Sequence, residues 1–228
     1  MRKAELYSDL NWIGNRFSYQ ALFKEFYRLA QVRYATRDQL YPFNNQVWTK
    51  PNLVKFCELD YLKPHDLVKA FHITEKTREI LEKEGFNVKV LQKKFTGQTL
   101  DHALKITSCL LKLQGQDNFY NVFYPTFTQP PSYTAEFLKP DACVVWKRDG
   151  AYKIEVVEVE TEKPDWENYL FIKKEKYEKL ARDPNTYRIW WKHHHVRLNL
   201  PLCQEADFCF SVVCFANIKK DWEGWKFG

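Results

Sequence analysis

The sequence predicts a mixed α/β protein with two domains, one over residues 1–97 and the other over residues 98–228. In the first part, apolar residues recur at the spacing of short helices, whereas the second part contains apolar strands with a helix between them. A helix that connects two strands indicates a parallel or mixed pair, which favours an α/β sandwich over a β-barrel. A chain of 228 residues, of which 45% are hydrophobic, is long enough to bury two cores.

Helical spacing and capping residues define the elements of the N-terminal part. Thr36 and Gln39 form a capping-box pattern, Pro51 falls in the first turn of a helix, and Thr74 is a suitable N-cap. In order, we expect helices over 18–33, 36–41 and 51–62, a strand-like run over 67–73, and a helix over 75–84.

This succession of elements resembles a winged helix-turn-helix domain. The resemblance implies that residues 51–62 are the recognition helix and that the residues around 63–73 form the wing. Lys50, Asn52 and Lys55 would then face the major groove of DNA. An ordinary small helical domain is the alternative.

An acidic hairpin is the most informative feature of the C-terminal part. Asp141 opens an apolar strand, Asp149-Gly150 is a hairpin turn signal, and a second strand ends in Glu158 and Glu160. Because strand side chains alternate, Glu158 and Glu160 share one face. Pairing about the turn brings Asp141 close to Glu158, where carboxylate oxygens can hold a hard divalent cation. The alternative is a half-buried hairpin with acidic residues on its solvated face.

A helix and two further strands are expected after the hairpin. Residues 166–182 place apolar side chains on one helical face with basic neighbours, which indicates a helix packed on the sheet. Residues 186–191 and 208–215 are typical of buried strands.

The hairpin residues resemble the PD-(D/E)xK nuclease superfamily. In that family the aspartate and the first glutamate bind the metal, and a lysine two residues later assists the attacking water. This sequence has Glu160 at the lysine position, which departs from the pattern. Some members carry the lysine on the following helix, where Lys173 is the candidate and Tyr177 shares its face. The resemblance implies that Asp141 and Glu158 hold Mg²⁺ or Mn²⁺, with Glu160 as an added ligand or base.

The order of the two parts is similar to that of plasmid replication-relaxation proteins, which join a winged helix to a PD-(D/E)xK-like domain. In that resemblance His102 falls on a core helix that faces the sheet, so it can point at the metal site. The resemblance implies a metal-dependent endonuclease acting on double-stranded DNA, with a homodimer or proteins of a mobile element or phage as further partners. The alternative is a non-catalytic replication or transcription regulator with a decayed nuclease fold, which the missing lysine favours.

Charge and composition limit the remaining possibilities. Residues 1–115 carry 19 Lys+Arg against 12 Asp+Glu, whereas residues 116–228 carry 16 against 17, so the net charge of +6 belongs to the N-terminal half. A basic half suits DNA binding, although it is also common in proteins that bind no DNA. The sequence has no Gly-rich phosphate loop, no secretory signal and no run of eighteen apolar residues. We therefore expect a cytoplasmic or nucleoid-associated protein without membrane contact.

Overall fold

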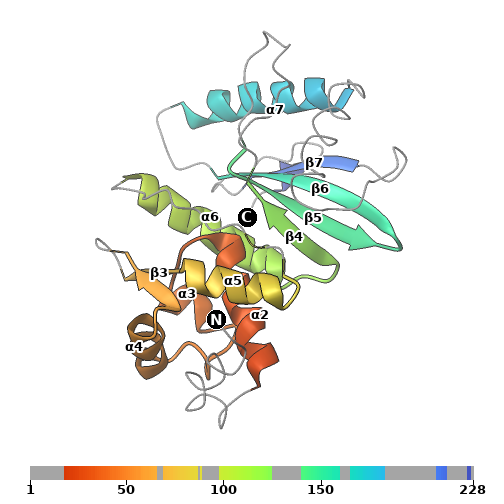
Figure 1. Cartoon of the computed structure of the whole chain (residues 1–228). Helices are drawn as coiled ribbons and strands as arrows, with labels where there is room; N and C mark the ends of the chain where they lie inside the picture. Colours follow the sequence, from red (N-terminus) through yellow and green to blue (C-terminus); the bar gives the residue numbers. More distant parts are fainter. Residues whose placement is uncertain are drawn as a thin grey trace. The chain divides into compact units, whose positions relative to one another are not determined.

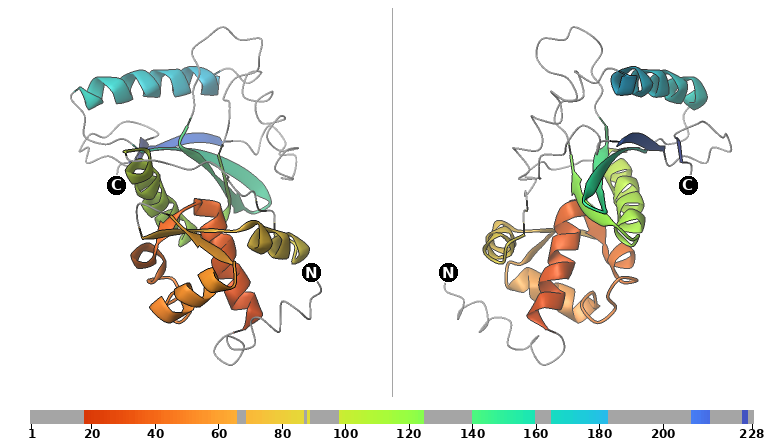
Figure 2. Two further views of the ribbon diagram at one scale, coloured as in Figure 1. Left: turned by 60° about the vertical axis from the view of Figure 1, so that its left-hand side comes forward. Right: turned by 90° about the vertical axis from the view of Figure 1, so that its right-hand side faces the viewer.

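The computed structural model describes residues 18–65, 69–86, 88, 98–124, 140–159, 165–182, 209–214 and 225–226. The chain separates into two compact units, residues 1–111 and residues 112–228. The described residues form helices and two sheets, so the fold is mixed α/β (Figures 1 and 2). Within the described residues, no helix is both long and apolar enough to cross a membrane.

The first unit alternates helices with very short strands. Its elements are α2 (Tyr19–Val32), β1 (Ala35–Thr36), α3 (Arg37–Leu40), α4 (Lys50–Glu58), β2 (Leu62–Pro64), β3 (Ala70–Ile73), α5 (Glu75–Lys83) and most of α6 (Gln98–Gln114). The strands form an antiparallel sheet in the order β1-β3-β2. The four predicted helices and the strand at the end of residues 67–73 are confirmed, although α4 ends earlier than expected, at Glu58.

Side-chain caps explain where these helices begin. The Thr36 hydroxyl accepts from the backbone N–H of Gln39, and the Gln39 side chain accepts in return from the backbone N–H of Thr36, which confirms the predicted capping box. Thr49 and Thr74 cap α4 and α5 in the same way, each accepting from the backbone N–H three residues later. Each cap satisfies an amide that would otherwise lack a partner in the first turn.

An aromatic core joins α2 to α4. The Phe26 ring meets the Phe56 ring edge-on at 5.1 Å and stacks on the Tyr61 ring at 6.0 Å between centroids. The Trp48 ring lies 6.3 Å from Phe26, and all four side chains are buried. Offset and edge-to-face contacts of this kind add to the large apolar area that each ring removes from water.

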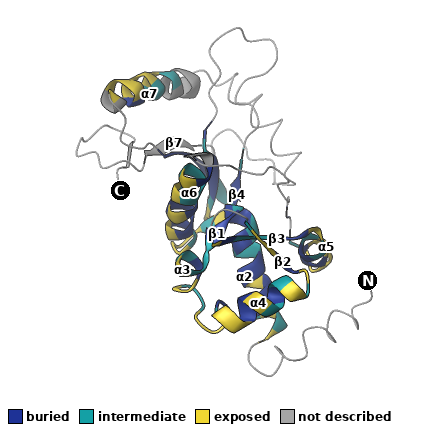
Figure 3. Ribbon diagram, turned by 90° about the vertical axis from the view of Figure 1, so that its left-hand side faces the viewer, coloured by how far each residue is buried: buried dark blue, intermediate teal, exposed yellow. Residues whose placement is uncertain are grey.

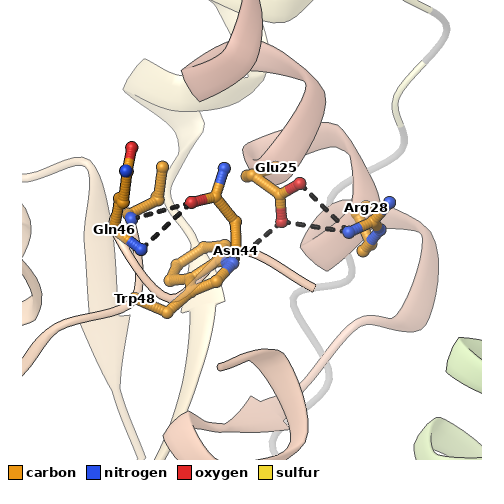
Figure 4. Close-up of polar contacts among 6 residues, drawn as sticks. Glu25, Arg28, Asn44, Gln46 and Trp48 are labelled. Carbon is orange, nitrogen blue, oxygen red and sulfur yellow. Dashed lines mark hydrogen bonds and ion pairs between the residues drawn. The ribbon is translucent and has the colours of Figure 1, made fainter. Parts of the chain in front are cut away.

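A buried carboxylate fixes the loop that leads into α4. Glu25 on α2 accepts hydrogen bonds from Arg28 Nη1 and from Trp48 Nε1, the latter at 2.9 Å (Figure 4). In the same loop, Asn44 Oδ1 accepts from the backbone N–H groups of Gln46 and Val47. Because Trp48 immediately precedes the cap of α4, these bonds hold the start of α4 against α2.

Helix α6 belongs largely to the first unit, whereas the sequence predicted a domain boundary before it, after residue 97. The Thr107 hydroxyl donates to the carbonyl oxygens of Tyr34 at 2.6 Å and Val32 at 3.2 Å. The Gln39 amide donates to Leu104 O at 2.9 Å. The two Thr107 bonds satisfy carbonyl oxygens at the end of α2 and before β1, and the Gln39 bond ties α3 to α6. Helix α6 therefore completes this unit, and the division falls after residue 111.

The second unit is built around a mixed sheet. Its elements after α6 are β4 (Phe119–Phe123), β5 (Ala142–Arg148), β6 (Ala151–Glu158), α7 (Trp166–Arg182), β7 (Cys209–Cys214) and β8 (Trp225–Lys226). Strands β4, β5 and β6 are antiparallel, whereas β7 is parallel to β6 and β8 is parallel to β7. The predicted helix and the strand within residues 208–215 are confirmed, and the strand predicted over 186–191 lies outside the described residues.

The β5–β6 hairpin pairs as its turn signal predicts. Asp149 and Gly150 both have positive φ angles, 50° and 84°, which match the twist of the flanking strands. The ladder then runs from Arg148 opposite Ala151 to Ala142 opposite Val157. This register decides which side chains meet at the open end of the hairpin.

Candidate active site

Two acidic residues lie at the open end of the β5–β6 hairpin. Ala142 is opposite Val157, so continuing the register by one residue sets Asp141 opposite Glu158. Asp141 directly precedes β5, and Glu158 is the last residue of β6. Cross-strand neighbours point to the same face, so both carboxylates belong to one face of the sheet.

Glu158 is buried and paired with a cation. Only 1% of the residue is exposed, and its Oε2 atom lies 2.9 Å from Lys173 Nζ. Lys173 comes from α7, which the chain reaches only after leaving β6. A buried carboxylate is costly without a partner, so this ion pair stabilises a charge at the end of β6.

Asp141 has a different partner. Its Oδ2 atom accepts a hydrogen bond from the backbone N–H of Val159 at 2.8 Å. Val159 directly follows β6, so the bond closes the end of the hairpin across the two strands. One carboxylate oxygen is therefore held by the backbone, which orients the whole side chain.

The charge of Glu158 contributes to a raised pKa of a neighbouring thiol, that of Cys143. Burial raises the pKa of Cys143 well above its usual range, and the negative charge of Glu158 raises it further. Cys143 is opposite Val156, on the same face as Glu158. The Cys143 thiol therefore stays protonated and acts as a small apolar neighbour of the acidic pair.

Helix α7 brings an aromatic ring to the same place. Lys173 Nζ lies 5.0 Å from the centroid of the Tyr169 ring, one helical turn earlier. Leu170 is fully buried, whereas Tyr169 is about half exposed. Leu170 thus anchors α7, and the exposed ring borders the Lys173–Glu158 pair.

Other residues predicted for this site are less well placed. Glu160 and the side chain of Tyr177 lie outside the described residues. His102 is on α6 within the first unit, so its part in a metal site stays a prediction. In the described part of the chain, no group of three or more His, Cys, Asp and Glu side chains is placed to hold a metal ion.

The residues predicted to contact DNA divide into two groups. Lys50 is exposed at the start of α4, and Lys55 is partly exposed, with its Nζ atom 3.1 Å from Glu58 Oε2. Figure 3 shows that α4 has both exposed and buried residues. Asn52, in contrast, is 1% exposed, and its amide donates to the carbonyl oxygens of Gln46 and Val47. The prediction that Asn52 faces the groove is therefore corrected, because its amide satisfies the loop before α4.

The structure also brings forward several residues that were not predicted individually as site residues. Lys63 and Lys69 are exposed on the β2–β3 hairpin, and basic residues beside a strand-like run were the available signal. On the other face of the larger sheet, buried Glu155 accepts from Trp146 Nε1 at 2.8 Å and Lys153 Nζ at 3.0 Å. No local pattern marks Glu155, because its partners depend on strand register.

Comparison with known proteins adds no relative. No family model, curated protein or solved structure matches the chain.

Proposed function

We propose that the protein is a metal-dependent DNA endonuclease of the PD-(D/E)xK type, directed to double-stranded DNA by a winged helix in its first unit. The observation that carries the proposal is the ion pair between Lys173 and Glu158, beside Asp141. This ion pair joins the acidic end of the hairpin to a lysine on the following helix. Some members of the PD-(D/E)xK superfamily, which the sequence resembles, carry their lysine on that helix.

The topology of the second unit supports this proposal. The chain runs from the antiparallel pair β5–β6 through α7 to β7, which pairs with β6 in parallel. A helical connection between parallel neighbours is the arrangement expected of the mixed sheet in such a domain. It is also the reason why a residue of α7 can reach the end of β6.

The donor groups suit a hard divalent cation. Asp141 and Glu158 supply carboxylate oxygens from adjacent strands, which are the ligands that Mg²⁺ and Mn²⁺ take. These two residues would hold the ion, and Glu160 would be a third ligand in the same proposal. A bound ion of this kind polarises a scissile phosphate and lowers the pKa of a bound water.

The chain's own residues supply the rest of the proposed chemistry. The Val159 N–H holds Asp141 by one oxygen, which fixes the direction of the other. Lys173 carries a positive charge beside Glu158, where it can orient water or neutralise charge that develops on a phosphate. The nearby Tyr169 ring limits the directions in which the Lys173 ammonium can move.

The first unit supports the proposed route to DNA. Its order of helix, strand, two helices and an antiparallel hairpin is the order expected of a winged helix, in which α4 would be the recognition helix. Lys50 and Lys55 lie on α4, and Lys63 and Lys69 lie on the hairpin in the position of the wing. Cations on both elements suit contact with phosphates.

A second function has its own support. Lys173 is held by Glu158 and Asp141 is bonded to the backbone, so both site residues also stabilise the fold. With Glu160 in the usual lysine position, a DNA-binding replication or transcription regulator with a decayed nuclease domain is the alternative proposal.

Cleavage assays separate the two proposals. The full-length protein is incubated with supercoiled plasmid, linear duplex and branched DNA in Mg²⁺ or Mn²⁺. We expect nicked or cut products, no cutting by Glu158→Gln or Asp141→Asn, and cutting slowed roughly tenfold or more by Lys173→Met. Lys174→Met removes the neighbouring lysine as a matched control and should cut normally. Duplex binding without cutting in either metal would favour the regulator.

A further inference from the structure

An aromatic and basic cluster lies near the turn of the β5–β6 hairpin. The rings of Tyr120 on β4 and Tyr152 on β6 are 5.4 Å apart between centroids and nearly perpendicular, at 74°. Lys147 Nζ on β5 lies 5.8 Å from the Tyr120 centroid and 5.6 Å from the Tyr152 centroid. Tyr120 and Lys147 are exposed, so the cluster presents rings and a cation to solvent rather than to the core. We call Tyr120, Lys147 and Tyr152 the tyrosine platform.

The tyrosine platform shares a sheet face with the candidate active site. Lys147 is directly opposite Tyr152, and Tyr152 and Glu158 are both at even-numbered positions of β6. Side chains alternate along a strand, so Tyr152 and Glu158 point to the same face. At about 3.3 Å per residue, the stretch of β6 from Tyr152 to Glu158 spans roughly 20 Å.

A local irregularity brings Tyr120 to that face. The register between β4 and β5 shifts between Phe119 and Asn121, where an additional residue is accommodated. Phe119 is opposite Trp146 and meets its ring edge-on at 6.1 Å, on the opposite face of the sheet. Tyr120, which lies between Phe119 and Asn121 in the sequence, contacts Tyr152 instead. The irregularity therefore presents one ring to each face.

The chemistry of the tyrosine platform suits unpaired bases. An exposed ring can stack on a base only if that base has a free face, and bases inside a duplex are covered on both sides. Lys147 places a positive charge beside the rings, where the phosphate of a stacked nucleotide would lie. Arg148 adds a second cation at the same end, since its pair with Asp149 is long, at 3.5 Å, and both side chains are exposed.

We propose that the tyrosine platform binds single-stranded DNA, and that the substrate class of the second unit is DNA with an unpaired flank beside the cut. The second clause depends on the proposed nuclease function, whereas the first does not.

Binding of a labelled oligothymidylate to the full-length protein tests the tyrosine platform directly. By fluorescence anisotropy, we expect Tyr120→Ala and Tyr152→Ala each to weaken binding roughly fivefold or more, because each removes a stacking ring. Tyr120→Phe and Tyr152→Phe should bind within about twofold of the wild type, since the ring remains. Lys147→Gln should reduce the dependence of binding on salt by about one phosphate contact.

A matched control comes from the first unit. Tyr41 has the same 38% exposure as Tyr120, and Arg37 lies 4.6 Å from its ring centroid, so Tyr41→Ala removes a comparable aromatic and cation pair. We expect it to leave oligothymidylate binding unchanged. Thermal unfolding checks each variant, and Tyr120→Leu and Tyr152→Leu replace any alanine variant that unfolds, because leucine keeps apolar bulk without a ring face.

The outcomes separate the tyrosine platform from the nuclease proposal. If both alanine variants, or both leucine variants, bind oligothymidylate as the wild type does, the proposal that the tyrosine platform binds single-stranded DNA is wrong, even if the protein cuts DNA. If the variants lose binding while the wild type cuts nothing, the platform stands and the nuclease proposal fails. Tighter binding of oligouridylate than of oligothymidylate by the wild type would overturn the assignment to DNA. If both proposals hold, the wild type should cut forked DNA faster than blunt duplex, and the alanine variants should lose this preference.

Discussion

Lys173 Nζ lies 2.9 Å from Glu158 Oε2, and this contact ties α7 to the end of β6. Glu158 is buried, so the pair is a structural contact as well as the centre of the proposed active site. Stability and activity must therefore be measured separately for each change at this place.

The first prediction concerns the stability of that ion pair. Lys173→Met should lower the free energy of unfolding by about 3 kcal/mol, because it leaves a buried carboxylate without its cation. Adding Glu158→Gln should restore part of this loss. A urea-unfolding double-mutant cycle measures the coupling, with Lys55→Met, whose Glu58 partner is exposed, as a control that should change by less than about 1 kcal/mol. Zero coupling would mean that the contact does not form in solution.

The second prediction separates folding from DNA binding on α4. Asn52→Ala should destabilise the protein by about 2 kcal/mol, because the carbonyl oxygens of Gln46 and Val47 lose a buried donor. Lys50→Gln and Lys55→Gln should change stability by less than about 0.5 kcal/mol. Each should weaken duplex binding, measured by anisotropy, by roughly 1 kcal/mol and reduce its salt dependence. Unchanged duplex affinity in the double lysine variant would contradict the winged-helix proposal.

The third prediction concerns the loop before α4. Trp48→Phe keeps an aromatic ring in the core but removes the indole N–H that donates to Glu25 at 2.9 Å. We expect a loss of about 1 to 3 kcal/mol in thermal or chemical unfolding, together with weaker duplex binding, since α4 loses its anchor to α2. Trp146→Phe removes the matching bond to Glu155 in the second unit. It should leave duplex binding by the first unit intact, and equal effects of both variants on binding would count against this account.

The fourth prediction is a pH dependence at His72. Burial lowers the pKa of His72 in the folded protein, and the nearby charges of Lys63 and His65 lower it further. The unfolded chain, with a pKa of about 6.5, therefore takes up this proton first. The stability from neutral His72 is fully present above about pH 6.5 and is lost as the pH falls through the lower folded pKa.

His72→Phe tests this by removing the titrating group while keeping an aromatic ring beside Tyr34, whose centroid lies 5.0 Å from that of His72. The melting temperature of the wild type should fall more steeply with acidification than that of the variant. Parallel curves for the two proteins between about pH 5 and pH 7.5 would show that His72 does not titrate as its burial implies.

The sequence alone determined the elements that depend on local interactions. Thr36 and Gln39 cap α3 from three residues apart, and Asp149-Gly150 forms the hairpin turn because both positions need positive φ. Once the turn was known, antiparallel pairing was enough to bring Asp141 and Glu158 to the same open end of the hairpin. Each of these relationships involves neighbours in sequence or a single ladder, so the residue types carry the information.

Only the tertiary structure determined to which unit α6 belongs and which partners the side chains of Asn52 and Lys173 have. Thr107 donates to Val32 and Tyr34, more than seventy residues earlier, and so α6 joins the first unit. Asn52 is buried because the loop before α4 folds back onto its amide. Lys173 reaches Glu158 through the packing of α7 on the sheet. These contacts depend on which side chains are buried and on which distant backbone groups need hydrogen-bond partners. The periodicity of a single segment carries no information on either.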